Sequence, residues 1–243
     1  MTQNIYDDPR FFAGYSALRR SVEGLDGAAE WPALRGLLPD LKGARVLDLG
    51  CGFGWFSRWA REAGAASVTA VDVSNNMLRR ARADTIDTAI VYEQADLEGF
   101  EPPRGAFDLA YSSLTLHYVR DLTGLLARVH DGLVGGGRLL VSVENPIYTA
   151  PSSPGWSVDA AGRRTWPIDS YSVEGPRVTD WLAPGVVKYH RTFGTYVNLL
   201  ITAGFRIDHV EDWGPTDEVL TARPDLAGER DRPMFLILAA SRS

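Results

Sequence analysis

The chain has 243 residues, of which 45% are hydrophobic, and it carries a formal net charge of −6. This length is enough for one well-filled hydrophobic core and short for two. The negative charge argues against a nucleic-acid partner, because nucleic acids are usually bound by a basic surface. No apolar run approaches the ~20 residues needed to span a bilayer and no signal peptide is recognisable, so we expect a cytoplasmic protein without membrane contact. With Cys51 as the single cysteine, an intrachain disulfide and a cysteine zinc cluster are excluded, and we expect no metal site.

Residues 1–40 are predicted to form a helical cap at the start of the chain. The segment combines aromatic side chains with a helical stretch that ends near Leu37 and Leu38. Its aromatic residues are Tyr6, Phe11, Phe12 and Tyr15. They either pack the first helix onto the rest of the protein or cover a ligand, and the pattern alone leaves both explanations open.

The segment from Val46 to Gly54 predicts a buried strand, a glycine-rich turn and the start of a helix. Val46, Leu47 and Leu49 form the nearly continuous apolar run of a parallel strand that is covered on both faces. The glycines that follow let the backbone turn tightly and let a ligand approach it. A strand, a bare turn and a helix N-terminus together indicate a nucleotide-binding crevice.

The spacing of these glycines favours one cofactor over another. The dinucleotide fingerprint is Gly-x-Gly-x-x-Gly, whereas this turn is Gly-x-Gly-x-Gly, with Trp55 after it and Asp48 two places before it. A carboxylate beside the turn would repel a pyrophosphate but suits the sulfonium and ammonium of S-adenosylmethionine. The segment closely resembles the first motif of the class I S-adenosylmethionine-dependent methyltransferases. The whole chain is broadly similar to the small-molecule branch of that family, which includes the methyltransferases of quinone biosynthesis.

Acidic residues follow the next two predicted strands. The run 67–72 ends in Asp72, whose carboxylate can accept both hydroxyls of a ribose, a placement that also fits an NAD site. A third strand over 89–93 precedes Asp96 and Leu97, which the resemblance places at the adenine ring. The resemblance thus implies a cofactor site built from a larger set of residues: Tyr15, Asp48, Gly50, Cys51, Gly52, Gly54, Asp72, Val73, Met77, Asp96, Leu97, Ser112 and Ser113. The Cys51 side chain is interpreted as packing and not as a nucleophile.

Strands alternate with helices through the rest of residues 44–144, the predicted cofactor-binding core. A fourth strand is predicted over 107–112 and a fifth over 138–144, with a helix from Asp121 that stops at the glycines 135–137. This alternation predicts an α/β fold with a doubly wound, mostly parallel sheet, whose ligand crevice lies at the carboxyl ends of the strands. Residues 190–243 are predicted to add a helix and two strands, and they resemble the closing antiparallel hairpin of the family's seven-stranded sheet.

Residues 145–189 lie outside this framework and are rich in aromatic residues and proline. So many prolines rule out a long helix, and a long segment of this kind in one domain is usually functional. We expect a lid over the methyl acceptor, with a short hairpin, for an acceptor with a planar or apolar body. A homodimer interface is the alternative, because tryptophan and tyrosine are enriched there too. The predicted lid residues are Trp156, Trp166, Trp181 and His190.

The predicted reaction is an in-line methyl transfer that releases S-adenosylhomocysteine. Such a displacement depends mainly on alignment and exclusion of water, and a base helps only where the acceptor atom carries a proton. His117, Glu144 and Tyr148 are the candidate catalytic residues. Two other function classes stay open: a cofactor-binding protein without turnover, and a nicotinamide-dependent oxidoreductase. The identity of the acceptor and of the methylated atom does not follow from the sequence.

Overall fold

The computed structural model describes residues 3–243. Its centre is a seven-stranded sheet in the order β10-β11-β5-β4-β1-β2-β3. The strands are β1 (Arg45–Leu49), β2 (Ser67–Asp72), β3 (Ile90–Gln94), β4 (Phe107–Ser113), β5 (Leu133–Glu144), β10 (Phe205–Trp213) and β11 (Phe235–Arg242). Neighbours from β3 to β5 pair in parallel, whereas β11 pairs antiparallel with both β5 and β10. The predicted fold class, a doubly wound and mostly parallel sheet closed by an antiparallel hairpin, is confirmed.

Two hydrophobic clusters cover the two faces of the sheet. On one face α3 (Trp31–Leu37) and α4 (Trp55–Glu62) contribute Trp31, Leu34 and Phe56 to a cluster with Val46 and Leu109. On the other face α6 (Leu122–Gly132) and α8 (Phe193–Thr202) pack their apolar residues against the sheet. A further helix, α5 (Asn75–Ala83), packs against β2 and β3. Burial on both faces explains the apolar runs in the strands β1, β4, β5 and β11.

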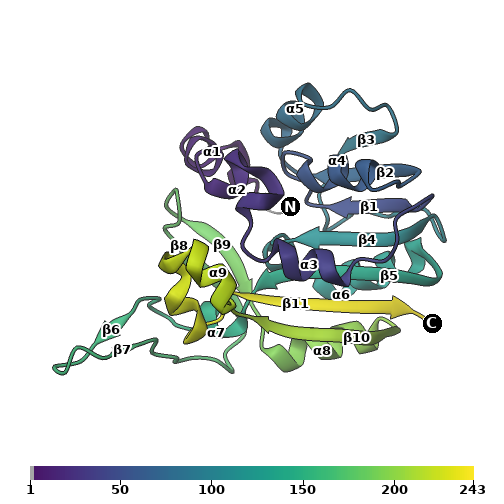
Figure 1. The fold of residues 1–243 in the computed structure, drawn as a ribbon. Coiled ribbons are helices and arrows are strands. Elements are labelled where there is room, and N and C mark those ends of the chain that lie inside the picture. The colour runs from purple at the N-terminus through teal and green to yellow at the C-terminus, as the bar shows by residue number, and fades with distance from the viewer. Residues whose placement is uncertain (1–2) are drawn as a thin grey trace.

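Three segments gather at the carboxyl ends of the parallel strands (Figure 1). The first is the N-terminal segment with η1 (Ile5–Asp7), α1 (Pro9–Ser16), α2 (Arg19–Val22) and η2 (Gly24–Gly27). The second, residues 145–189, holds α7 (Pro146–Thr149) and the strands β6 (Ser157–Val158), β7 (Arg164–Thr165), β8 (Gly175–Thr179) and β9 (Val186–His190). The third connects β10 to β11 through α9 (Asp217–Ala222) and η4 (Pro224–Arg230). One more short 3-10 helix, η3 (Leu116–Tyr118), follows β4.

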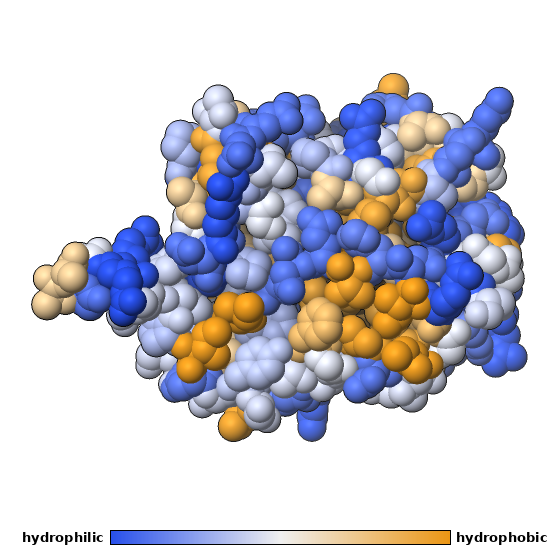
Figure 2. All heavy atoms as spheres, turned by 60° about the horizontal axis from the view of Figure 1, so that its bottom comes forward, coloured by the Kyte–Doolittle hydropathy of each residue, from blue (hydrophilic) through white to orange (hydrophobic). Residues whose placement is uncertain are grey.

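The 145–189 segment contains two hairpins where one was expected. Strands β8 and β9 pair antiparallel at the edge of the sheet's carboxyl end. The shorter β6–β7 hairpin projects away from the body of the molecule, and its surface is mostly hydrophilic (Figure 2). None of the helices formed by residues 3–243 is long and apolar enough to cross a membrane.

The boundary between α6 and β5 differs from the sequence prediction. The helix ends at Gly132 and not at the three glycines 135–137. A Cβ on Gly132 would lie 2.8 Å from the Pro102 ring, so the chain turns where only glycine fits. Phe107 pairs with Leu133 and Leu109 pairs with Arg138, which leaves residues 134–137 as a bulge in β5. Between β10 and β11, where the sequence predicts two strands and no helix, the chain also forms α9 and η4.

Candidate cofactor and acceptor site

The glycine turn after β1 has the predicted bare backbone. Gly50 has a φ of 75°, and a Cβ there would lie 2.1 Å from Oγ1 of Thr115, so this position excludes any side chain. Gly52 has a φ of 53°, but no heavy atom lies within 4 Å of the position of its Cβ. Gly50 and Gly52 both line a cavity of about 910 Å³ at the strand ends. The turn therefore presents open backbone to the space where a ligand would lie.

Asp72 holds the turn and faces the same cavity. One carboxylate oxygen accepts from the Gly52 N–H at 2.9 Å and the other from the Ser74 N–H at 2.8 Å. Burial raises the pKa of Asp72 to about 6, although both hydrogen bonds favour the charged form. Each oxygen keeps a lone pair for a ligand hydroxyl. Val73, Met77, Asp96 and Leu97, which are predicted to contact the cofactor, line the cavity beside it.

The N-terminal segment is bound to this end of the sheet through Asp7. Its carboxylate accepts from the Ser74 hydroxyl at 2.6 Å and from the Asn76 N–H at 2.9 Å. These bonds place Tyr6 and Tyr15 in the wall of the cavity, with their rings 5.1 Å apart in an edge-to-face contact. The rings of Tyr6 and Tyr15 therefore pack on one another and also face the cavity, and whether they cover a ligand stays a prediction.

Asp48 and Cys51 lie next to the main cavity and not in its wall. Both line a smaller adjoining cavity of about 100 Å³, which shares Tyr15, Arg20, Gly50, Gly52 and Ser113 with the larger one. The Asp48 carboxylate accepts from the Ser57 hydroxyl at 2.6 Å, and burial raises its pKa to about 7. Burial also raises the pKa of the Cys51 thiol well above its usual range, which keeps it protonated.

Two predicted cofactor residues do not line either cavity. The Ser112 side chain is fully buried, and its hydroxyl donates to the Leu49 carbonyl at 2.8 Å. Successive side chains of a strand point to opposite faces, so Ser113 lines the cavity and Ser112 does not. Gly54 packs against Tyr92, where a Cβ would lie 2.2 Å from the phenol oxygen, and its role is to fit the start of α4 against β3.

The three predicted catalytic residues all line the main cavity. The His117 ring is buried, and its Nδ1 accepts a hydrogen bond from the Glu144 N–H at 3.3 Å. Burial, together with the nearby Lys188 and Arg191, lowers the pKa of His117 well below its usual range. The Glu144 carboxylate is paired with Lys188 at 2.5 Å. Burial and Glu144 raise the pKa of Tyr148, so its phenol stays protonated.

Among the four predicted lid residues, Trp181 lines the cavity and the other three do not. Trp166 donates from its indole to the Ile147 carbonyl at 3.0 Å, and it packs edge-to-face on Trp156. The guanidinium of Arg232 lies over both of these rings and over Tyr148. His190 bridges the Thr149 hydroxyl and the Tyr171 carbonyl. These three side chains hold the 145–189 segment in place instead of facing a ligand.

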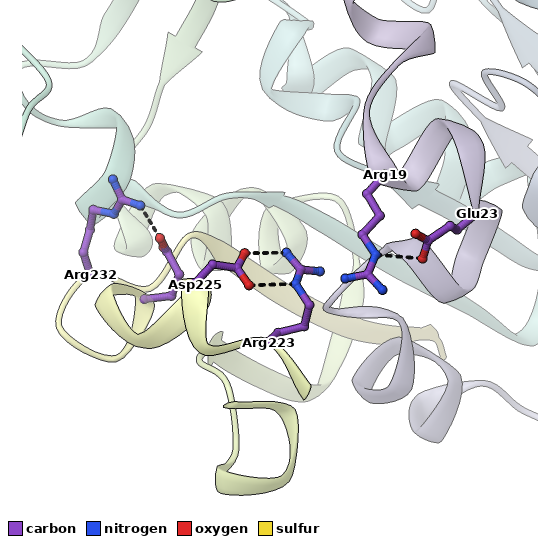
Figure 3. Close-up of polar contacts among 6 residues, drawn as sticks. Arg19, Glu23, Arg223, Asp225 and Arg232 are labelled. Atoms are coloured by element: carbon purple, nitrogen blue, oxygen red, sulfur yellow. Dashed lines mark hydrogen bonds and ion pairs between the residues drawn. The ribbon is translucent and has the colours of Figure 1, made fainter. Parts of the chain in front are cut away.

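Charged side chains in the cavity wall were missed by sequence reasoning. Four cations each pair with a carboxylate: Arg19 with Glu23, Arg20 with Glu30, Lys188 with Glu144, and Arg223 with Asp225. Figure 3 shows the Arg19 pair of α2 facing the Arg223 pair at the start of η4. The only signal for any of them in the sequence is Lys188, a charge within the apolar run of β9.

Comparison with known proteins identifies related chains. A family model described as a methyltransferase domain matches residues 46–137. An S-adenosylmethionine-dependent methyltransferase of known structure from Mesorhizobium loti is 62% identical, with a TM-score of 0.88, and the match covers 90% of this chain and 100% of that chain.

Two relatives known from sequence extend the comparison. An uncharacterised protein of Haemophilus influenzae is 34% identical over 217 residues, or 86% of this chain and 85% of its own length. A malonyl-[acyl-carrier protein] O-methyltransferase of Erwinia billingiae is 34% identical over 137 residues, which span 55% of this chain and 53% of that protein. The Mesorhizobium loti methyltransferase uses S-adenosylmethionine, and the Asp72 carboxylate and the open Gly52 backbone of this chain suit the same cofactor. The chain therefore belongs to the class I S-adenosylmethionine-dependent methyltransferases.

Proposed function

We propose that this methyltransferase acts on a small-molecule acceptor that is held beneath residues 145–189. The observation that carries the proposal is the continuity of the cavity, which runs from Gly50 and Asp72 at the strand ends to Tyr148 and Trp181 of that segment. Its volume of about 910 Å³ is near the upper limit for ligand pockets, which leaves room for an acceptor beside the cofactor. The net charge of −6 favours such an acceptor over a nucleic acid.

The cofactor would lie along the carboxyl ends of β1, β2 and β4. Asp72 would accept the ribose hydroxyls, and Met77 and Leu97 would flank the adenine with Asp96 beside it. Arg20 and Tyr15 line both cavities next to Gly50, which suits the carboxylate of the amino-acid end. Asp48, with Ser57 bound to it, would add negative charge on the side of the ammonium group.

When it is bound, S-adenosylmethionine supplies an electrophilic methyl group on its sulfonium. The protein's own contribution is to orient the acceptor and to exclude water. His117 presents an Nε2–H to the cavity, since its Nδ1 lone pair is used by the Glu144 N–H, and so it acts as a hydrogen-bond donor and not as a base. Glu144 is neutralised by Lys188, and Tyr148 stays protonated. These groups position an acceptor that reaches the site with its lone pair already free.

Residues 145–189 would then form the lid of the acceptor site. Tyr148 and Trp181 offer ring faces and edges to the cavity, which suits a planar or apolar acceptor body. Trp156, Trp166 and Arg232 support this lid from behind. The malonyl-[acyl-carrier protein] O-methyltransferase that this chain resembles over about half its length is named for a malonyl group carried on a protein, and the methylated group itself is small enough for such a cavity.

Isotope transfer tests the proposal. The purified protein is incubated with S-adenosylmethionine labelled in its methyl group and with a bacterial extract, which is then divided into small-molecule and macromolecular fractions. We expect the label in the small-molecule fraction, and at a low concentration of S-adenosylmethionine we expect Asp72→Ala to reduce the transfer while Asp131→Ala, on the exposed end of α6, leaves it unchanged.

Other distributions of the label would contradict the proposal in different ways. Label found only in the macromolecular fraction would indicate a protein or nucleic-acid acceptor. Tight cofactor binding in calorimetry without any labelled product would favour a cofactor-binding protein without turnover.

A further inference from the structure

The cavity continues past the cofactor site to the antiparallel edge of the sheet. Its wall there comes from the N-terminal segment and from the chain between β10 and β11, and it contains six apolar residues: Leu18, Ala29, Trp213, Leu226, Met234 and Phe235. We call the part of the cavity that these six residues line the distal pocket. Because the cofactor would lie over β1, β2 and β4, the distal pocket is left for the acceptor.

The strand register determines where the distal pocket lies. Glu144 at the end of β5 pairs with Phe235 of β11, which in turn pairs with Trp213 of β10. The buried Asn145 fixes this row, because its side-chain amide donates to the Asp212 carboxylate at 2.6 Å and to the Phe235 carbonyl at 3.3 Å. From β5 to β10 the row covers two strand spacings, about 10 Å, which is long enough for a chain of several methylene groups.

The apolar residues of the distal pocket keep surface that the fold does not cover. Trp213 and Leu226 are buried in the hydrophobic cluster beneath α3 and α4. Leu18, Met234 and Phe235 are only half-buried, so part of each side chain still faces the open space of the cavity. Removing apolar surface from water is favourable, so an apolar group of a ligand would be stabilised by binding here.

The charges around the distal pocket balance one another. Positive and negative side chains form four ion pairs: Arg19–Glu23, Arg20–Glu30, Arg223–Asp225 and Arg232–Glu229. Figure 3 shows the first and third of these pairs facing each other, and they form the solvent-exposed rim of the pocket. A wall of apolar side chains and paired charges favours an uncharged group over an anion or a cation, because a buried charge without a partner is costly.

We propose that the methyl acceptor carries an uncharged apolar chain and that this chain occupies the distal pocket. The inference rests on the proposed function and names the class of its acceptor, a molecule with a polar reacting end and an apolar chain. The reacting end would lie beside the cofactor and beneath Tyr148 and Trp181, and the chain would extend from it over β11 and β10. Ala29 and Met234, which belong to the two segments that enclose the pocket, are thus specificity-determining residues for the chain.

Calorimetry with the full chain, saturated with S-adenosylhomocysteine, tests the inference with four probes. The probes are phenol, 4-ethylphenol, 4-butylphenol and 4-hexylphenol, which share an uncharged planar head and differ only in the apolar chain. We expect roughly a threefold gain in affinity for each added methylene group until the chain fills the pocket, and a gain of about 30-fold or more for 4-hexylphenol over phenol.

Two variants show whether the distal pocket is the origin of this gain. Met234→Gln places a polar amide in the wall and should lower the affinity for 4-hexylphenol about fivefold. Ala29→Trp fills the pocket with a ring and should lower that affinity by about 30-fold, since the chain is then left in water. Both variants should bind phenol as the wild type does. Val22→Gln makes an apolar-to-polar change on an exposed residue of α2 that does not line the cavity, and it should leave the whole series unchanged.

Several results would overturn the assignment of the distal pocket. These are equal affinities across the series, a gain with chain length that is unchanged in either folded variant, or variants that weaken phenol as much as 4-hexylphenol. If Ala29→Trp fails to fold, Met234→Gln alone decides. A protein that binds S-adenosylhomocysteine but none of the four probes would also overturn it. Failure of S-adenosylhomocysteine to bind would overturn the proposed function, and this inference with it.

Discussion

The Nδ1 atom of His117 accepts a hydrogen bond from the backbone N–H of Glu144 at 3.3 Å. This contact joins the loop after β4 to the end of β5 and fixes the ring tautomer with its proton on Nε2. A histidine that was predicted from the sequence as a candidate base therefore presents a donor to the acceptor cavity.

Replacing His117 should separate its hydrogen-bond role from a catalytic one. His117→Leu leaves the Glu144 N–H without an acceptor and should cost about 1–3 kcal/mol of unfolding free energy, measured with urea. His117→Asn keeps a side-chain acceptor and should cost less. Methyl transfer by the wild type and by His117→Asn should show the same pH profile from 6 to 8. A rate that falls on protonation of His117 in the wild type, and not in the variant, would show that the ring is a base after all.

Gly50 and Gly52 should respond differently to the same substitution. Gly50→Ala forces a methyl group into the Thr115 side chain, and it should lower the unfolding free energy by roughly 2 kcal/mol or more. Gly52→Ala meets no atom within 4 Å, so its stability loss should be limited to the cost of positive φ, about 1–2 kcal/mol. Its methyl group should instead reduce the affinity for S-adenosylhomocysteine. Equal stability losses for the two variants would contradict this distinction.

Asp48 should make the ligand-free protein less stable as the pH rises. Its pKa is about 7 in the folded protein and about 3.9 in an unfolded chain, so the folded state binds more protons between these values. The unfolding free energy contributed by this group is therefore fully present below pH 4 and lost as the pH rises to 7. Asp48→Asn removes the charge, keeps an acceptor for Ser57, and should stabilise the protein at pH 8 by roughly 2–4 kcal/mol.

A matched variant and a second pH complete that experiment. Asp131→Asn removes an exposed carboxylate and should change the stability by less than about 0.5 kcal/mol. At pH 4 the gain from Asp48→Asn should vanish. A gain that does not depend on pH would rule out the buried charge as its origin.

Asp72 should control cofactor affinity. Asp72→Ala removes the carboxylate that we propose accepts the two ribose hydroxyls, and it should weaken binding of S-adenosylmethionine by about 1–3 kcal/mol in calorimetry. Because burial raises the pKa of Asp72 to about 6, wild-type affinity should increase from pH 5 to pH 7 and then level off. The Asp72→Ala variant should lack that increase. An affinity that is the same for both proteins at pH 7 would refute the ribose assignment.

Lys188 and Glu144 should behave as a coupled pair. The Lys188 side chain is buried and that of Glu144 is only 13% exposed, so Lys188→Met leaves a poorly solvated, unpaired carboxylate and should destabilise the protein by roughly 3 kcal/mol. Adding Glu144→Gln removes that charge and should restore part of the loss. The double-mutant cycle, measured by urea unfolding, should give a coupling energy above about 1 kcal/mol. Additive losses would mean that the two charges do not depend on each other.

The sequence by itself determined which residues gather at the edge of the sheet where the cofactor would bind. Gly50, Asp72 and Asp96 each follow a strand, and parallel strands bring their carboxyl ends to one edge, so local patterns were enough to predict that they converge. Their roles depend on backbone conformation and on position after a strand, and both are encoded within a few residues.

Tertiary structure alone decided which side chains face the cavity. Trp156 and Trp181 look alike in the sequence, but only Trp181 lines the cavity, since Trp156 packs on Arg232 and Trp166. Ser112 and Ser113 point to opposite faces of β4, and the sequence does not tell which of the two serines points toward the cavity. The charge balance of the cavity depends on pairs such as Lys188 with Glu144, 44 residues apart in the chain. Such pairing is a property of the folded chain.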